Sequence, residues 1–174
     1  MMISSDINGA LNEQIGHEFG ASVQYVSIAA YFECEGLPAL AKHFYRQAIE
    51  EREHAMRFVK YVLDADGRVA IPAIAAPKSD FGSAEEAVRL SLDWEIAVTK
   101  QINAIMDLAI KRNDHMTKNF LEWFISEQRE EVSSMDTLLK MVRRAGENGL
   151  LFVENYLARD EHGIGEHAAA GNDA

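Results

Sequence analysis

The sequence predicts an all-α protein, a four-helix bundle with a long crossover between its second and third helices and a short fifth C-terminal helix. Apolar residues recur at helical intervals of three, four and seven in four long segments. Of the 174 residues, 48% are apolar and only three are proline, a composition that favours helices. One segment, residues 67–82, has no helical period. A chain of this length is expected to form one domain with a good core and without disulfide or metal staples.

The first two helices are expected to form an antiparallel hairpin. The first begins near Ser5 or Asp6, either of which could cap it. Gly36 is suited to end that helix, and Pro38 is well placed to begin the next one, which runs to about Ala65. Because the connection is so short, the two helices must be antiparallel neighbours.

The connection over residues 67–82 is predicted to be a crossover. It contains Gly67, Pro72, Pro77 and Gly82 and is unusually long for an unstructured loop in a compact domain. A helix of about 27 residues is roughly 40 Å long, and a loop of this length can span roughly 55 Å. The loop can therefore return along the whole bundle, so that the second and third helices run parallel.

The second half of the chain is expected to form another helical hairpin. Ser83 and Glu86 make a capping-box pattern at the start of the third helix. Asn113 and Asp114 make a tight turn into the fourth helix, which Gly146 is suited to end.

A short apolar helix is predicted from Leu150 to Arg159. A four-helix core has no room for it, so we expect it to dock on another subunit. The bundle and this helix form one predicted domain, residues 1–160. Residues 161–174 are rich in Ala, Gly and charge and are expected to form a flexible C-terminal tail.

The overall charge and the single cysteine narrow the classes of partner. The formal net charge of −11 argues against nucleic acid and anionic membranes and suits the attraction of cations. Cys34 is the only cysteine, so the chain contains no disulfide framework. The N-terminal segment lacks a basic region followed by an apolar one, and no stretch approaches a membrane span. We therefore expect a soluble protein in the cytoplasm.

Two polar residues interrupt the apolar stripe of the second helix. Glu51 and His54 recur in step with Leu40, Phe44 and Phe58. An ionised carboxylate inside a protein is costly unless it is paired, hydrogen-bonded or bound to metal. On its own, a Glu-x-x-His pattern is more often a surface or structural pair than a metal site. The prediction of a metal site therefore needs further residues.

Both halves of the chain carry polar core residues at the same spacing. In each hairpin, a glutamate in the first helix precedes a polar residue in the second by 33 residues, and another polar residue follows three positions later. Two residues of a hairpin lie level when their average position falls at the turn, and both sets meet this condition. The six residues are Glu18, Glu51, His54, Glu95, Gln128 and Glu131.

These six side chains are predicted to converge on one buried site. Four carboxylates, one imidazole and one amide suit a pair of hard-to-borderline cations, with Glu51 able to bridge them. Oxygen ligands with a single nitrogen fit iron, and no cysteine cluster suggests structural zinc. The alternatives are a buried hydrogen-bond network without metal and a helix rotation that exposes these residues.

From about residue 6 to residue 160, the chain resembles the bacterial non-haem ferritins. The matching segments are Leu11-Asn12-Glu13-Gln14 leading to Glu18, Glu50-Glu51-Arg52-Glu53-His54, Glu95, and Trp123-Phe124-Ile125-Ser126-Glu127-Gln128-Arg129-Glu130-Glu131. Bacterioferritins carry a methionine directly after the bridging glutamate, where this chain has Arg52, and a second histidine that is absent here. We therefore expect no haem. Rubrerythrins would require a cysteine-rich segment, which this chain lacks.

The resemblance implies a ferritin-like fold, a ferroxidase centre and iron storage. By similarity, the first iron would be held by Glu18, Glu51, His54 and Gln128. The second iron would be held by Glu51, Glu95 and Glu131. Fe(II) would be oxidised by O2 or H2O2 at this di-iron centre, and ferric mineral would collect inside a hollow homo-oligomeric shell, a 24-mer.

Two further assignments and two rival functions stay open. A third iron position, implied by the resemblance, would use Glu50, Glu127 and Glu130, which could equally be ordinary solvated glutamates. Tyr25 lies two turns from Glu18 on the same stripe. It should hydrogen-bond or donate an electron near the site, unless it is a core tyrosine with a satisfied hydroxyl. The rival functions are a di-iron oxidase or peroxidase without storage, and a four-helix bundle without metal.

Overall fold

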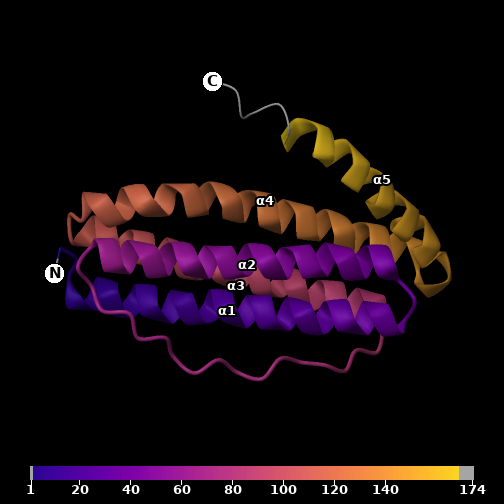
Figure 1. Ribbon diagram of the computed structural model, residues 1–174, viewed down its shortest axis with the longest axis horizontal. Coiled ribbons are helices and arrows are strands. Elements are labelled where there is room, and N and C mark those ends of the chain that lie inside the picture. The colour runs from indigo at the N-terminus through magenta and orange to yellow at the C-terminus, as the bar shows by residue number, and fades with distance from the viewer. Residues whose placement is uncertain (1, 169–174) are drawn as a thin grey trace.

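Four long helices form a bundle of two antiparallel hairpins lying side by side (Figure 1). The computed structural model describes the backbone of residues 2–168 and the side chains of residues 2–159. The elements are α1 (Ser5–Cys34), α2 (Pro38–Asp64), α3 (Ala84–Lys111), α4 (His115–Ala145), a 3-10 turn (Glu147–Gly149) and α5 (Leu150–Ala168). No strand occurs within residues 2–168, which confirms the all-α prediction. Among the described residues, no helix has the length and apolarity that crossing a membrane requires.

Local sequence signals set most of the helix boundaries. Gly36, with φ of 71°, ends the first hairpin turn, and Pro38 opens α2. The hydroxyl of Ser83 accepts a hydrogen bond from the Glu86 N–H at 3.1 Å, as the capping-box pattern predicts. The return bond is shifted by one residue, because the Glu86 carboxylate accepts from the Gly82 N–H at 2.7 Å.

The start of α1 differs from the predicted cap. The helix begins at Ser5, but Ser4 is the N-cap residue and makes no side-chain capping bond. The expectation that Ser5 or Asp6 caps this helix is therefore wrong. Both residues lie inside the helix, so the cap position falls to Ser4, whose hydroxyl donates to the Asp6 carboxylate at 2.5 Å. That carboxylate also accepts from the Ile7 N–H at 3.1 Å.

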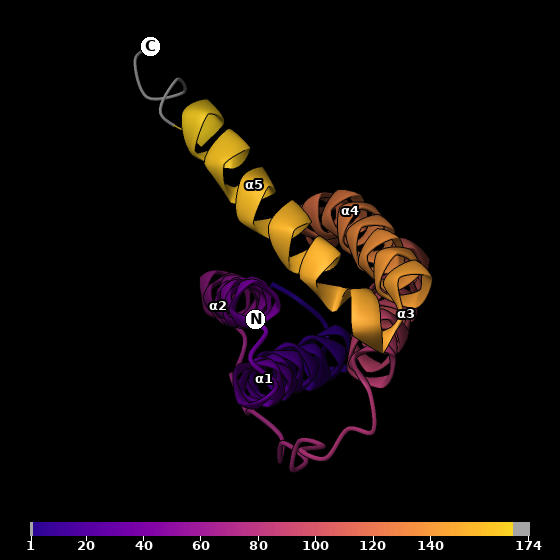
Figure 2. The same cartoon turned by 90° about the vertical axis from the view of Figure 1, so that its right-hand side faces the viewer.

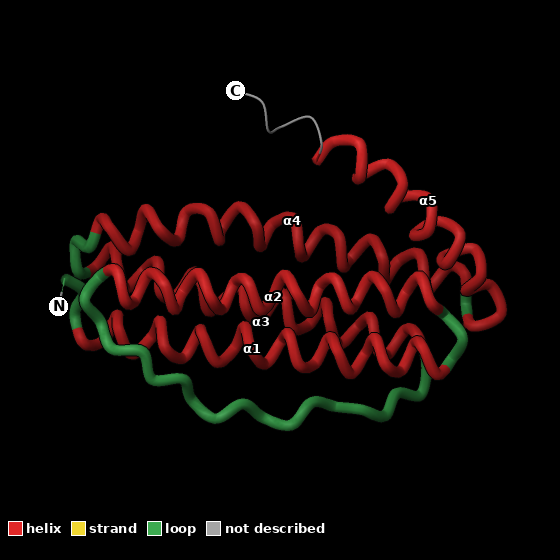
Figure 3. Tube along the Cα trace, in the orientation of Figure 1, coloured by secondary structure: helices red, strands yellow, loops and turns green. Residues whose placement is uncertain are grey.

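The crossover runs the length of the bundle along α1 and makes α2 and α3 parallel, as predicted (Figure 3). It covers residues 65–83 and is tied to α1 by side-chain amides. Asn12 donates to the Arg68 carbonyl at 2.9 Å and accepts from the Ala70 N–H at 2.6 Å. Gln24 forms the same kind of pair with the backbone of Lys78, at 2.9 and 2.8 Å. These paired amides satisfy backbone groups that have no helix or sheet partner.

The apolar core is divided into two clusters with a polar layer between them. One cluster lies toward the α1–α2 turn and includes Phe32, Phe44 and Leu138. The other lies toward the α3–α4 turn and includes Phe58 and Leu121. Each such side chain contributes about 1.5–3 kcal/mol by leaving water, so the two clusters hold the bundle together on either side of the polar layer.

The fifth helix packs on the end of the bundle and then leans away from it (Figure 2). Its carboxylate Glu154 accepts hydrogen bonds from the backbone N–H groups of Ala39 and Leu40, both at 2.8 Å. It thereby caps α2, whose own N-cap residue, Leu37, makes no side-chain capping bond.

The fifth helix is also longer than predicted. It continues past Arg159 to Ala168. The chain has no proline after Pro77 to stop the helix. Residues 169–174 of the predicted tail lie outside the described residues.

Candidate metal centre

The polar layer between the two apolar clusters is formed by the six side chains that the sequence pattern singled out. All six are buried, although five are charged or titratable groups. They come from all four long helices and are Glu18 (α1), Glu51 and His54 (α2), Glu95 (α3), and Gln128 and Glu131 (α4). The alternative of a helix rotation that exposes them is therefore excluded.

Two groups of potential metal-binding atoms meet in this layer. Ligand atoms of Glu18, Glu51 and His54 all lie within 4.8 Å of one another. Those of His54, Glu127 and Glu131 do so as well. His54 belongs to both groups, and its Nδ1 lies 3.6 Å from Oε2 of Glu51. The imidazole ring is held at its edges by the rings of Trp123 and Phe124, with centroids 5.5 and 5.8 Å away.

Several buried polar atoms of this layer have no hydrogen-bond partner among the described residues. They are Oε2 of Glu18, Oε2 of Glu95, both carboxylate oxygens of Glu51, and Nδ1 of His54. Leaving such atoms unpaired inside a protein costs free energy. Cations placed among them would satisfy such atoms, so this donor set fits metal better than it fits a metal-free hydrogen-bond network.

Hydrogen bonds occupy one oxygen of Glu18 and one of Glu95, but neither oxygen of Glu51. Oε1 of Glu18 accepts from the amide of Gln14 at 2.9 Å, and Oε1 of Glu95 accepts from the hydroxyl of Tyr25. Each of these carboxylates therefore keeps one oxygen for a metal. Glu51 keeps both oxygens, so its geometry favours a bridging ligand.

Burial and mutual repulsion raise the pKa values of the carboxyl groups in the layer. Burial is the largest cause for each of Glu18, Glu51 and Glu95. The negative charge of Glu51 adds to the effect on Glu18, and that of Glu95 adds to the effect on Glu51. Burial, with a further contribution from Glu95, raises the pKa of Glu131 to about 8. Without a cation, the cluster therefore holds protons that a divalent metal would displace.

The three glutamates of the suggested third position lie in different surroundings. Glu50 is half-buried, with a pKa raised by burial, and accepts a hydrogen bond from Gln47. Glu127 is half-buried and belongs to the group with His54 and Glu131. Glu130 is exposed, and its carboxylate lies 3.7 Å from the guanidinium of Arg129. The structure thus brings Glu127 to the buried polar layer and places Glu130 at an ion pair outside it.

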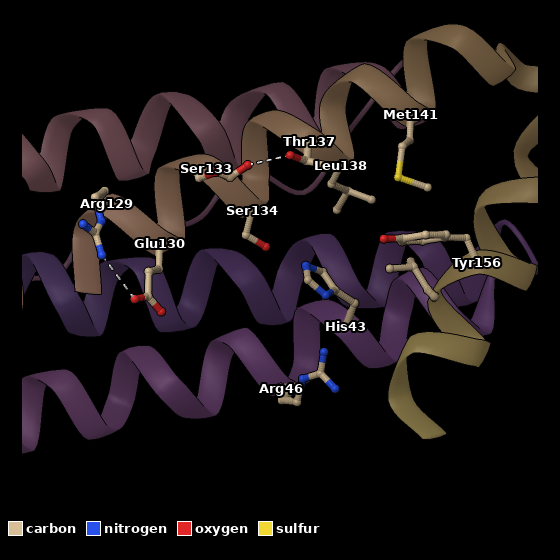
Figure 4. Close-up of a pocket in the computed structure, with 11 residues that line it drawn as sticks. His43, Arg46, Arg129, Glu130, Ser133, Ser134, Thr137, Leu138, Met141 and Tyr156 are labelled. Atoms are coloured by element: carbon tan, nitrogen blue, oxygen red, sulfur yellow. Dashed lines mark hydrogen bonds and ion pairs between the residues drawn. The ribbon is translucent and has the colours of Figure 1, made fainter. Parts of the chain in front are cut away.

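A separate cavity of about 530 Å³ lies between α2, α4 and α5. Figure 4 shows Glu130 and Arg129 at one side of it, with His43 from α2 and Tyr156 from α5 directed into it. Its lining contains none of the six residues of the buried layer. The buried polar layer is therefore separate from this cavity.

Two functionally placed residues escaped the sequence analysis. Gln14 appeared there only within a matching segment, and Thr99 did not appear at all. Thr99 donates to Oε1 of Gln128 at 3.0 Å, on the outer side of the layer. Gln14 lies four residues before Glu18, and Thr99 lies four residues after Glu95. A search for polar residues one helical turn from each candidate ligand would have found both.

Tyr25 is fully buried and its hydroxyl donates to Glu95, with the Ser91 carbonyl 3.4 Å away. The expected hydrogen bond near the site is thus present. Burial is the first cause, and the negative charge of Glu95 the second, of a pKa well above the usual value for this phenol. The hydroxyl is therefore protonated, and it stays a donor.

The chain is similar to ferritins over most of its length. A family model described as a ferritin-like domain matches residues 8–145. A protein of Mycolicibacterium smegmatis named ferritin BfrB is 43% identical over 168 residues, 97% of this chain and 92% of that protein. A bacterial non-heme ferritin of Staphylococcus aureus is 35% identical over 158 residues, 90% of this chain and 95% of that protein. The crystal structure of an open pore ferritin from Archaeoglobus fulgidus superposes with a TM-score of 0.87 at 34% identity, covering 90% of this chain and 96% of that chain.

Proposed function

Because this chain belongs to the ferritin-like family, we propose that it oxidises Fe(II) at its buried polar layer and stores the product as ferric mineral. The observation that carries the proposal is the set of buried oxygen and nitrogen atoms without partners, on Glu18, Glu51, His54 and Glu95. Hard oxygen donors stabilise Fe(III) more than Fe(II), so a site of this composition makes the oxidation of iron favourable.

In the proposed reaction, iron is the substrate and the side chains of the layer hold two ions close together. The two ions would share Glu51. Glu18 and His54 would hold one ion, and Glu95 and Glu131 the other. Each Fe(II) gives up one electron, and O2 takes both electrons with two protons to form H2O2. When H2O2 is the oxidant, the same two electrons and two protons reduce it to two molecules of water.

The surrounding residues leave carboxylate oxygens free for metal and keep bulk water out of the layer. Gln14 and Tyr25 each occupy one oxygen of a terminal carboxylate and leave the other free. The raised pKa of Glu131 means that iron binding displaces a proton from the cluster. The two apolar clusters on either side exclude bulk water from the layer.

Storage requires a closed compartment, which we propose is a shell of 24 copies in the cytoplasm. The support from this chain is the outward face of α5, where Leu151 and Phe152 are 69% and 80% exposed. Apolar side chains so exposed on a helix at the end of a bundle are suited to contact another subunit. The formal net charge of −11 per chain would attract Fe(II) to such a particle.

The decisive experiment is aerobic Fe(II) loading of the apoprotein, followed by size-exclusion chromatography that monitors protein and iron together. We expect hundreds of iron atoms per particle to elute with a large oligomer. A small oligomer that retains only about two irons per chain would contradict storage and favour a di-iron oxidase or peroxidase instead. Absence of any iron uptake would favour a metal-free bundle.

A matched pair of variants tests the oxidation centre within the same experiment. Glu51→Gln keeps the shape of the side chain and removes its charge, and we expect oxidation to slow by about 100-fold. Glu53→Gln, two residues along α2 and exposed, should leave the rate unchanged. Equal rates for the two variants would show that the buried layer does not carry out the oxidation.

A further inference from the structure

Gln128 has a side chain that can serve a metal centre in two opposite ways. Its amide oxygen accepts and can bind a metal, whereas its amide nitrogen only donates hydrogen bonds. Gln128 is 1% exposed, so its amide is fixed by the groups packed around it. The orientation of this amide decides how many oxygen ligands the centre offers.

On its outer side, the Gln128 amide meets Thr99 of α3. The Thr99 hydroxyl lies 3.0 Å from Oε1 of Gln128 and 2.8 Å from the backbone carbonyl of Glu95. Both of these oxygens are acceptors, and the hydroxyl shares its single proton between them. Thr99 and Gln128 also line a largely apolar groove of about 490 Å³ between α3 and α4, with Ile96 and Ile125 in its wall.

On its inner side, the Gln128 amide meets the carboxylate of Glu95. Gln128 lowers the pKa of Glu95, against the larger raising effect of burial, as an amide N–H that faces the carboxylate would. A carboxylate attracts an N–H and repels an amide oxygen. The hydroxyl of Thr99 and the carboxylate of Glu95 therefore favour the same orientation, with the oxygen outward and the nitrogen inward.

We propose that Thr99 is a positioning residue, whose hydroxyl keeps the oxygen of Gln128 turned away from the metal centre. Gln128 then supplies a hydrogen-bond donor rather than the metal ligand that the family resemblance suggested. The centre loses one oxygen ligand by this arrangement and holds metal less tightly. A storage protein needs such a centre because its oxidised product must leave for the mineral. This inference rests on the proposed iron centre.

Two variants of Thr99 separate its hydroxyl from its shape. Thr99→Val is nearly isosteric and removes the hydroxyl, whereas Thr99→Ser keeps it. The measurement is an anaerobic Co(II) titration of the apoprotein that records affinity, stoichiometry and the visible absorption spectrum of bound Co(II). Without the hydroxyl, the amide oxygen is free to turn toward the metal. We expect Thr99→Val to bind one Co(II) roughly three- to tenfold more tightly, with an altered spectrum. Thr99→Ser should match the wild type.

A double-mutant cycle tests whether Thr99 acts through Gln128. In a Gln128→Leu background, Thr99→Val should change neither the affinity nor the spectrum, because the amide is gone. The proposal is overturned if Thr99→Val has the same effect in both backgrounds, weakens binding, or has no effect in the wild-type background. Wild-type protein that takes up no Co(II) would instead contradict the proposed iron centre itself.

Discussion

The two helical hairpins place polar residues at the same spacing but surround them differently. In the α1–α2 hairpin, Glu51 and His54 carry buried ligand atoms without hydrogen-bond partners. In the α3–α4 hairpin, Glu95 accepts from Tyr25 and Gln128 accepts from Thr99. The first hairpin therefore offers more unpaired donor atoms to a metal, whereas Glu95 and Gln128 of the second are each restrained by a hydroxyl donor. The backbone pattern places the ligands, and their neighbours determine what each one can do.

Among the differences between the two hairpins, the largest expected effect comes from removing one terminal carboxylate from each in turn. Glu18→Gln should abolish the metal position on the first hairpin, and Glu95→Gln the position on the second. Each variant should bind one Co(II) per chain instead of two and oxidise Fe(II) at least tenfold more slowly. Equilibrium titration under anaerobic conditions counts the ions. Loss of both ions in either variant would show that the two hairpins do not form separate positions.

The raised pKa values predict a pH dependence of the apoprotein. Glu131 has a pKa of about 8 in the folded state and 4.5 as its ordinary value. Between these values the unfolded chain binds fewer protons than the folded chain, so the free energy of unfolding falls as pH rises from about 4.5 to 8. The fall should amount to a few kcal/mol, because each pKa unit corresponds to about 1.4 kcal/mol.

Urea unfolding at pH 5 and pH 8, in the presence of a chelator, measures this effect. Glu131→Gln should remove part of the fall, and saturating Zn(II) should reverse it, since metal binding favours the ionised form. An apoprotein that is equally stable at both pH values would mean that folding does not raise the pKa values of the buried carboxyl groups.

The outer donors of the two hairpins should have separate and smaller effects. Gln14→Leu removes the donor to Glu18, and Tyr25→Phe removes the donor to Glu95. We expect each variant to weaken one metal position by about tenfold and to leave the other unchanged. Competition with a chelator of known affinity would resolve the two positions. If both variants weaken the same position, the assignment of donors to hairpins is wrong.

The smallest expected effect comes from the crossover that connects the two hairpins. Asn12→Ala removes two hydrogen bonds to residues 68 and 70, so unfolding should become easier by roughly 1–2 kcal/mol. The rate of Fe(II) oxidation should stay the same, because the hydrogen bonds of Asn12 go to residues 8, 68 and 70 and not to the buried polar layer. A slower oxidation rate would show that the crossover helps to position the metal ligands.

The bundle and its six central side chains could be predicted because their cause is periodic. A glutamate on an apolar stripe is costly wherever it occurs, and the turn position of each hairpin then fixes its height. Which side chains of different helices contact one another does not follow from this periodicity. Thr99 lies one turn from Glu95, but its hydrogen bond to Gln128 depends on how α3 and α4 pack. Periodicity cannot reveal that contact.

The fifth helix is another region where the local sequence pattern predicts the element but not its contacts. The sequence places an apolar helix after Gly146, and the structure contains one. Its length beyond Arg159 and the contact of Glu154 with α2 were not predicted. The length could have been inferred from the absence of a proline after Pro77. The contact of Glu154 depends on a partner more than 100 positions away in the chain, which the local pattern cannot reveal.

The cap that Glu154 places on α2 makes the position of the last helix depend in part on the first hairpin. The N–H groups of Ala39 and Leu40 point out of the helix as a pair only when α2 is formed. The direction in which the exposed Leu151 and Phe152 face is therefore set in part by the start of α2, more than 100 positions earlier in the chain.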